Sequence, residues 1–365
     1  MAYDQQQSVS CALIYGLCEH HLDHIAPLCS FLQIPLYVTE PCIEEKALSF
    51  YPNIQVRYCQ SQDIADHLMQ YQQVLTALPK DLFDALFFLH RNAEMALPKN
   101  IWCPHGNSDK GLRSFFTEAL RKESVALVYG QTMLEYFSSK KALNEKCKTI
   151  QVGSYRYNFY RKHQKFYQEK ATLHFLSKLS SKNKTILYAP TWADSEGFCS
   201  VSMVLKPLLE NKPQDLNLII KLHPNTLLDG DCKIQQLVLR YESCPNIVFI
   251  ENFPPIYPLL AYTDLYLGDS SSIGYDMLHF KKPMLFINIL GSSFDLPLFQ
   301  AGKVLYVNDL VNLYAHLRNH LLDQNNHHRQ QSLLCNKTFA RKDEMKKLFD
   351  LMTFSAAPSP CKLFV

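Results

Sequence analysis

The sequence predicts an α/β protein built from two parallel-sheet domains. Short apolar runs alternate with helical patterns along both halves of the 365-residue chain, which is the order that parallel α/β domains require. Several runs are apolar at consecutive positions, as expected for strands covered by helices on both faces. A chain of this length is long for one core and suits two domains of ordinary size.

Six strands are expected in each half. Those of the first half are Ala12–Leu17, Pro35–Thr39, Ile54–Cys59, Ala85–Leu89, Ala126–Tyr129 and Thr149–Val152. Those of the second are Thr185–Ala189, Asn217–Leu222, Ile247–Ile250, Asp264–Leu267, Met284–Ile287 and Val304–Val307. The basic stretch Tyr160–Ser180 has a helical period where the halves join, and Asp343–Thr353 is expected to form a last amphipathic helix. We therefore expect an N-terminal domain over 1–160, a C-terminal domain over 161–345, and a helix and tail over 346–365.

Composition excludes several classes of protein. A net charge of +3 is too small to indicate nucleic acid as a partner. The longest apolar runs are too short to span a bilayer, and the first residues carry no signal segment, so a cytoplasmic protein is expected. The twelve cysteines are scattered, with no C-x-x-C pair and no tight Cys/His cluster along the sequence, so neither a zinc site nor a disulfide scaffold is expected.

The segment Asp269-Ser270-Ser271-Ser272 is the most informative of the chain. It lies between the apolar run Leu259–Leu267 and a helix-like segment that ends at a second strand, Pro283–Ile287. A hydroxyl-rich turn at a helix N-terminus favours anions, although serines there are also ordinary helix caps. Asp276, one helical turn further on, could accept hydrogen bonds from a sugar or glycerol hydroxyl, or favour the first turn of the helix electrostatically.

Polar residues follow other predicted strands as well. His105-Gly106 with Lys110 combines a candidate general base, a glycine that permits close approach of a ligand, and a cation for phosphate. The alternative is that His105 is a structural or surface histidine of a turn. Lys221 and His223 end a strongly apolar strand; the alternative is a strand-end charge and a histidine that only completes a hydrogen bond.

An aromatic residue and a hydroxyl follow a further strand. Thr191-Trp192 could bind a nucleotide base or ribose, or pack between elements. Because open parallel sheets bind ligands at the carboxyl ends of their strands, all these groups are expected at one rim of each sheet, facing a cleft. The sequence has no G-x-G-x-x-G, Walker lysine or Gly-x-Ser-x-Gly motif, which disfavours dinucleotide redox enzymes and P-loop NTPases.

Taken together and in this order, the motifs resemble the CDP-glycerol glycerophosphotransferase family, the polyol-phosphate polymerases and primases of teichoic acid assembly. The resemblance runs from about residue 100 to 290 and rests on Pro104-His105-Gly106 with Lys110, Gly153-Ser154-Tyr155-Arg156, Tyr188-Ala189-Pro190-Thr191-Trp192, Lys221-Leu222-His223-Pro224, Asp269-Ser270-Ser271-Ser272, Tyr275-Asp276 and Lys281-Lys282-Pro283. It implies a GT-B architecture, in which two doubly wound parallel-sheet domains enclose the active site between them and the C-terminal domain holds most of the nucleotide donor.

The resemblance also implies roles for residues. His105 would be the base that acts on the acceptor hydroxyl, and His223 would stabilise or protonate the leaving phosphate. The residues implied in substrate binding are Gly106, Lys110, Arg156, Thr191, Trp192, Lys221, Asp269, Ser271, Ser272 and Asp276. Of these, Thr191, Ser271 and Ser272 would hydrogen-bond the diphosphate, with charge added by Arg156 or Lys221. No cofactor is expected, and Mg²⁺ is left open because no pair of carboxylates stands out as a metal site.

The implied reaction moves glycerol phosphate, or a related polyol phosphate, from a CDP-activated donor to a hydroxyl of a lipid-linked or polymer acceptor and releases CMP. Since such acceptors are lipid-linked, the basic stretch Arg161–Lys182 is the candidate contact with the inner face of the cell membrane; the alternative is a solvated helix face.

Four positions depart from the family's pattern, namely Pro104, Tyr155, Ala193 and Ser270 in place of Trp, Pro, Arg and Tyr. The loss of the arginine at Ala193 removes one phosphate contact, which leaves open a GT-B glycosyltransferase that uses a nucleotide sugar. A non-catalytic relative that binds a nucleotide or a polymer is the third hypothesis.

Overall fold

The computed structural model describes residues 9–90, 96–107, 119–192, 199–228, 231–291, 293, 295–323, 327–339 and 345–353. Two sheets, of seven and six strands, lie in separate halves of the chain, and every strand pair in both is parallel. The predicted α/β architecture with two parallel sheets is therefore confirmed.

The first sheet has the order β3-β2-β1-β4-β5-β6-β7. Its strands are β1 (Ser10–Ile14), β2 (Leu36–Val38), β3 (Val56–Tyr58), β4 (Gln73–Thr76), β5 (Lys99–Trp102), β6 (Val125–Val128) and β7 (Lys148–Gln151). In register, Ala12 lies opposite both Leu36 and Leu75. Every residue of β1 is buried, which explains its unbroken apolar run.

The second sheet has the order β10-β9-β8-β11-β12-β13. Its strands are β8 (Lys184–Tyr188), β9 (Leu216–Ile220), β10 (Ile247–Phe249), β11 (Leu265–Gly268), β12 (Met284–Asn288) and β13 (Lys303–Tyr306), so all six strands expected in this half are present. In both sheets the strand order reverses beside the first strand, between β1 and β4 and between β8 and β11. Ligands of doubly wound folds bind at the carboxyl ends of the strands at such a reversal.

One expected strand is wrong. Residues 85–89 belong to the end of α4 (Lys80–Leu86) and to a 3-10 turn, η2 (Phe88–His90). Phe83 and Phe87, four residues apart, are fully buried, whereas Phe88 and Leu89 are 66% and 89% exposed. This spacing is the period of a helix, which a run of consecutive apolar residues conceals. The expected strands also omit β4 and β5.

Helices cover both faces of the sheets. Those of the first half are α1 (Leu22–Leu32), α2 (Pro41–Phe50), α3 (Ile64–Leu68), α4, α6 (Gln131–Ser139), α7 (Tyr155–Lys162) and α8 (Gln164–His174). Those of the second are α9 (Val201–Glu210), α10 (Pro224–Leu228), α11 (Cys232–Tyr241), α12 (Tyr257–Ala261), α13 (Ile273–Met277), α14 (Leu313–Leu322), α15 (His328–Thr338) and α16 (Met345–Thr353). The helical pattern expected over Tyr160–Ser180 corresponds to the end of α7, to α8 and to a short 3-10 turn.

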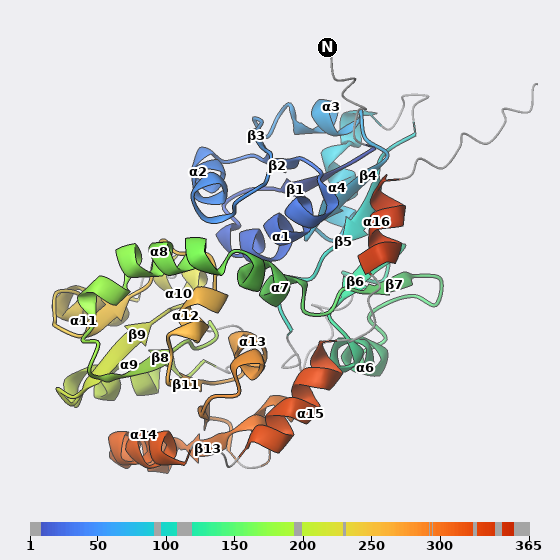
Figure 1. The fold of residues 1–365 in the computed structure, drawn as a ribbon. Helices are drawn as coiled ribbons and strands as arrows, with labels where there is room; N and C mark the ends of the chain where they lie inside the picture. The colour runs from blue at the N-terminus through green and yellow to red at the C-terminus, as the bar shows by residue number, and fades with distance from the viewer. Residues whose placement is uncertain are drawn as a thin grey trace, which may run out of the picture.

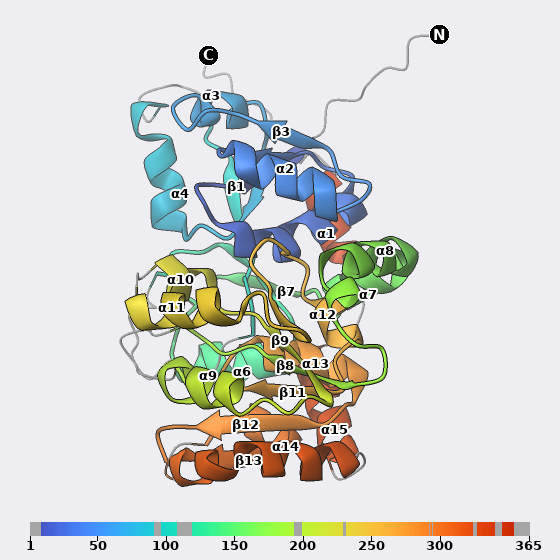
Figure 2. The same cartoon turned by 90° about the vertical axis from the view of Figure 1, so that its left-hand side faces the viewer.

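The chain crosses between the two halves twice. Figures 1 and 2 show α7 and α8 between the half that contains β1 and the half that contains β8, while α16 lies back on the first half. The helix α15 packs against α6, where the hydroxyls of Thr132 and Thr338 lie 3.1 Å apart, and α16 packs against β7 and α1. Ser10 Oγ donates a hydrogen bond of 2.6 Å to the carbonyl of Met352. The domain limits at residues 160 and 345 stay predictions.

Candidate active site

Three histidines from the first domain lie together at the carboxyl ends of its strands. His20 and His21 belong to the 3-10 turn η1 (Glu19–His21) after β1, and His105 follows β5. The ring centroids of His20 and His21 are 4.3 Å apart, those of His20 and His105 are 5.6 Å apart, and those of His21 and His105 are 5.0 Å apart. We call these three residues the histidine cluster.

The second domain brings His223 to this cluster. Its ring centroid lies 5.8 Å from that of His20 and 6.0 Å from that of Trp192, with the Trp192 and His223 rings tilted by 30°. The Nδ1 atom of His223 accepts a hydrogen bond of 3.2 Å from the backbone N–H of Asn225, so a neutral imidazole carries its proton on Nε2. The fold thus places His105 and His223, the two expected catalytic residues, within ring-contact distance of His20.

Burial and mutual repulsion keep the cluster uncharged at neutral pH. Burial lowers the pKa of His105 to about 4, and a charge on His20 would lower it further. Burial also lowers the pKa of His21 to about 2, with His105 and His20 acting in the same direction. The pKa of His20 is lowered by burial, although Glu19 opposes the shift. Each ring therefore has a nitrogen lone pair with which to accept a proton or bind a cation.

The carboxylate of Asp269 joins the loops that follow β8 and β11. It is 1% exposed and accepts hydrogen bonds from the backbone N–H of Thr191 at 2.7 Å, the N–H of Ser200 at 2.9 Å and the Ser200 hydroxyl at 2.8 Å. These bonds fix Thr191 and the start of α9. Asp269, which the resemblance places in substrate binding, has its carboxylate directed at protein donors.

Gly106 brings the two domains into contact beside Asp269-Ser270-Ser271-Ser272, which we call the serine turn. Its φ of +145° is one that residues with a side chain rarely adopt, and a Cβ built there would lie 2.8 Å from Ser272 Oγ. Ser270 and Ser271 are buried, and Ser272 is half-buried immediately before α13. The loop that carries His105 therefore touches the predicted diphosphate-binding turn.

Arg156 and Asp276 bind each other. The Arg156 guanidinium, 5% exposed, donates two hydrogen bonds of 3.0 and 2.9 Å to the Asp276 carboxylate, and also binds the carbonyl and carboxylate of Asp23. The Tyr257 hydroxyl donates to Asp276 at 2.9 Å. These contacts link α7, α13 and α1 across the two domains. The resemblance places both residues in substrate binding and did not indicate this structural role.

Lys221 lies at the same junction. Its Nζ donates a hydrogen bond of 3.0 Å to the carbonyl of Phe253. Burial lowers the pKa of its ammonium, while Glu19 and Asp23 of the first domain act in the opposite direction. Lys110 and Ala193 lie outside the described residues.

His20 and His21 are not among the site residues predicted from the sequence. The signal was present, because Glu19-His20-His21-Leu22-Asp23-His24 holds three histidines in five residues directly after a buried strand. The expectation of no Cys/His cluster is wrong in space, since the fold adds His105, from a distant part of the sequence, to the adjacent pair.

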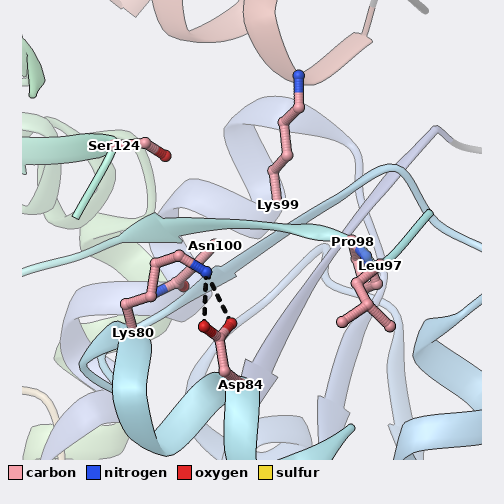
Figure 3. Close-up of a pocket in the computed structure, with 7 residues that line it drawn as sticks. All are labelled: Lys80, Asp84, Leu97, Pro98, Lys99, Asn100 and Ser124. Atoms are coloured by element: carbon pink, nitrogen blue, oxygen red, sulfur yellow. Dashed lines mark hydrogen bonds and ion pairs between the residues drawn. The ribbon is translucent and has the colours of Figure 1, made fainter. Parts of the chain in front are cut away.

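A pocket of about 300 Å³ lies away from this site (Figure 3). Lys99 and Ser124, which help to line it, stand at the amino ends of β5 and β6, whereas His105 follows the carboxyl end of β5. The Lys80 and Asp84 side chains that line it are paired with each other at 2.7 Å. Its position at the amino ends of the strands is the reverse of what doubly wound folds use for ligands.

Comparison with known proteins identifies the family. The model of the family described as CDP-Glycerol:Poly(glycerophosphate) glycerophosphotransferase matches residues 109–311, which is more than half of the chain. The chain belongs to this glycerophosphotransferase family. It is accordingly a CDP-glycerol glycerophosphotransferase-like transferase, and the resemblance drawn from the motifs is confirmed. Comparison with curated protein sequences found no match.

Solved structures share the fold of this chain. A variant of the wall teichoic acid polymerase TagF soaked with CDPG is 14% identical, with a TM-score of 0.63 over 94% of this chain and 88% of that chain. MnaA of S. aureus with UDP is 12% identical, with a TM-score of 0.55 over 96% and 98% of the two chains. UDP-GlcNAc 2-epimerase from Neisseria meningitidis bound to UDP-GlcNAc is 14% identical, with a TM-score of 0.56 over 89% and 98%. The architecture is GT-B, as predicted.

Among the residues described above, none of the helices is both long and apolar enough to span a bilayer.

Proposed function

We propose that the chain transfers glycerol phosphate from CDP-glycerol to a hydroxyl of a polyol-phosphate acceptor and releases CMP. The observation that carries the proposal is that His105 of the first domain and His223 of the second both lie against His20, while Gly106 touches Ser272, in a chain of this family. An acceptor held by one domain and a donor held by the other would react where these groups meet.

In the proposed step, the acceptor oxygen attacks the phosphorus that carries glycerol. A new P–O bond forms to the acceptor, the bond from that phosphorus to the bridging oxygen breaks, and CMP leaves with the bonding electrons. His105 takes the acceptor proton, and His223 donates its Nε2 proton as a hydrogen bond to the leaving phosphate. Thr191, Ser271 and Ser272 would bind the diphosphate.

The low pKa of His105 fits this step once the donor is present. A base whose pKa is about 4 is always unprotonated at neutral pH but takes up a proton weakly. A bound diphosphate beside the cluster would favour the protonated imidazole and raise this pKa toward neutrality. Binding of the donor would thereby strengthen the base before the acceptor reacts.

The test is the release of CMP from CDP-glycerol in the presence of a short glycerol-phosphate primer on a lipid anchor, measured by ion-exchange chromatography. Wild-type protein and His67→Asn, a control at an exposed histidine of α3, should release CMP in proportion to primer elongation. His105→Asn should lower kcat by about 100-fold or more, with donor affinity kept. Full turnover by His105→Asn would refute the assignment of the base.

A second candidate function is glycosyl transfer from a nucleotide sugar. It is favoured by the alanine at position 193, where the family has an arginine that contacts phosphate, and GT-B folds host both chemistries. Thermal-shift measurements with CDP-glycerol, CDP-ribitol, CMP and UDP-sugars separate the two, because a ligand that binds only the folded state raises the Tm. Stabilisation by UDP-sugars alone would favour the glycosyltransferase, and a response to none would favour a non-catalytic relative.

We also propose that α8 contacts an anionic membrane that carries the acceptor. Arg161, Lys162 and Lys165 are exposed at the end of α7 and the start of α8, and Leu173 is 72% exposed further along α8. Co-sedimentation with vesicles that contain phosphatidylglycerol should weaken with added salt and with Lys162→Gln/Lys165→Gln. Binding that is insensitive to both would count against this surface.

A further inference from the structure

We propose that His20, His21 and His105 form a binding site for a divalent transition metal of the zinc class, and that the bound ion inhibits transfer. The inhibitory part rests on the proposed function, because it assumes that His105 is the base. The site itself does not depend on that assumption.

The geometry of the cluster suits such an ion. One ring nitrogen from each of the three residues can be chosen so that the three atoms all lie within 4.8 Å of one another. Tetrahedral zinc, with ligands at about 2.0–2.1 Å, needs nitrogen atoms about 3.4 Å apart. Rotation of the side chains by a small amount would close that difference.

The donor set selects the class of ion. Three imidazoles suit Zn²⁺, Co²⁺, Ni²⁺ and Cu²⁺, whereas Mg²⁺ and Ca²⁺ require oxygen ligands. The nearest carboxylate in the sequence, Glu19, is paired with Lys46 and so is not counted among the ligands. Three protein ligands leave a fourth tetrahedral position for water, which is the arrangement of an open zinc site rather than of a closed structural one.

The fold provides the two halves of the site separately. His20 and His21 come from the turn after β1, and His105 comes from the loop after β5, where Gly106 holds that loop against Ser272 of the second domain. A metal there would tie the two loops of the first domain together at the domain junction.

Coordination of His105 would occupy the lone pair that must accept the acceptor proton. The metal-bound protein would therefore keep its donor-binding turn and lose its base. Zinc should act as a reversible inhibitor that chelators remove.

The test uses Co²⁺, whose ligand-field absorption reports tetrahedral binding without any assay of activity. Protein of residues 1–365 is stripped with EDTA and titrated with Co²⁺, and the same titration is made with His20→Asn, His21→Asn, His105→Asn and the exposed control His67→Asn. We expect one tightly bound ion in the wild type and in the control. Each cluster variant should lose more than about 100-fold in affinity, which is the upper end of what the loss of an outer-shell partner costs.

Circular dichroism of each variant before titration ensures that only folded protein is compared, and His21→Gln provides a second substitution if His21→Asn does not fold. Equal Co²⁺ binding by the wild type and all three cluster variants, or no tight binding by the wild type, would overturn the site. Zn²⁺ should also suppress CMP release by the wild type, reversibly with EDTA. Stimulation by Zn²⁺ would overturn the inhibitory role, whereas a protein that releases no CMP at all but binds Co²⁺ through the cluster would refute the proposed function alone.

Discussion

The Nη1 atom of Arg156 donates to both carboxylate oxygens of Asp276, at 3.0 and 2.9 Å, across the junction of the two domains. Both side chains are nearly inaccessible to water, with relative exposures of 5% and 8%. Removal of Asp276 takes away one of the two carboxylates that face the buried guanidinium, the other being Asp23, and also removes the acceptor of the Tyr257 hydroxyl. Breaking a buried ion pair typically costs about 3–5 kcal/mol.

We therefore expect Asp276→Ala to lower the free energy of unfolding by about 3 kcal/mol or more in urea titrations. Arg318→Met is the matched control, because the Arg318–Asp215 pair is of similar length, 2.7 Å, but half-exposed on both sides. Its effect should stay below about 1 kcal/mol. Equal losses in the two variants would show that the buried pair adds nothing beyond a surface pair.

The contact between Gly106 and Ser272 predicts a specific effect of a single methyl group. Gly106→Ala adds a Cβ that would lie 2.8 Å from Ser272 Oγ and also imposes a strained φ. Gly291→Ala imposes a comparable strain at φ +85°, with no atom within 4 Å of the new Cβ. Both variants should lose about 1–3 kcal/mol of stability, but only Gly106→Ala should also lose donor affinity or turnover. If both variants lost activity, the loss would be due to lowered stability rather than to the contact between Gly106 and Ser272.

Asp269 is expected to act as a positioning residue for the donor. Asp269→Asn replaces one acceptor oxygen by an N–H₂ group that would face the donors of Thr191 or Ser200, and the loss of a charged hydrogen bond costs about 1.5–3 kcal/mol. We expect the Kd for CDP-glycerol to rise by about tenfold or more. Ser200→Ala removes only the hydroxyl bond and should weaken the donor less. If Asp269→Asn lowered the Tm but left the donor affinity unchanged, the role of Asp269 would be purely structural.

The pKa of His105 predicts an unusual pH profile. Because this pKa is lowered to about 4, the unprotonated base persists well below neutrality, and kcat/KM should fall only as the pH approaches that value. The acid limb of kcat, which reports the enzyme with substrate bound, should lie at higher pH, because the anionic donor favours the protonated imidazole. Circular dichroism at each pH controls for unfolding. An acid limb of kcat/KM near 6.5, the ordinary value for histidine, would contradict this assignment.

The strands of the second sheet could be predicted because each is a run of apolar residues that helices cover on both faces. The strand β4 could not be predicted in this way, because it has only Val74 and Leu75 between polar residues. The segment Ala85–Leu89, which follows it along the chain, is more apolar although it is mostly helical. Local hydrophobicity does not report which of two segments is enclosed by the rest of the fold.

The candidate site, too, could be predicted from the sequence only in part. His105, His223 and the serine turn lie in motifs that are short in sequence, so the resemblance locates them. The histidine cluster and the Arg156–Asp276 pair depend on residues that only the packing of distant segments brings together. In particular, a sequence shows that Arg156 and Asp276 are charged but not that each satisfies the other.

The second crossing of the chain has a consequence for how the two domains can move. The backbone passes between them once through α7 and α8. It returns through α15, which packs against α6 of the first domain and against the 3-10 turns Leu278–Phe280 and Pro297–Ala301 of the second, to α16, which packs on the first domain. A body tethered at a single point can swivel in any direction, whereas one tethered at two is confined to a turn about the line that joins them. Any relative motion of the two domains would therefore be confined to a turn about one axis.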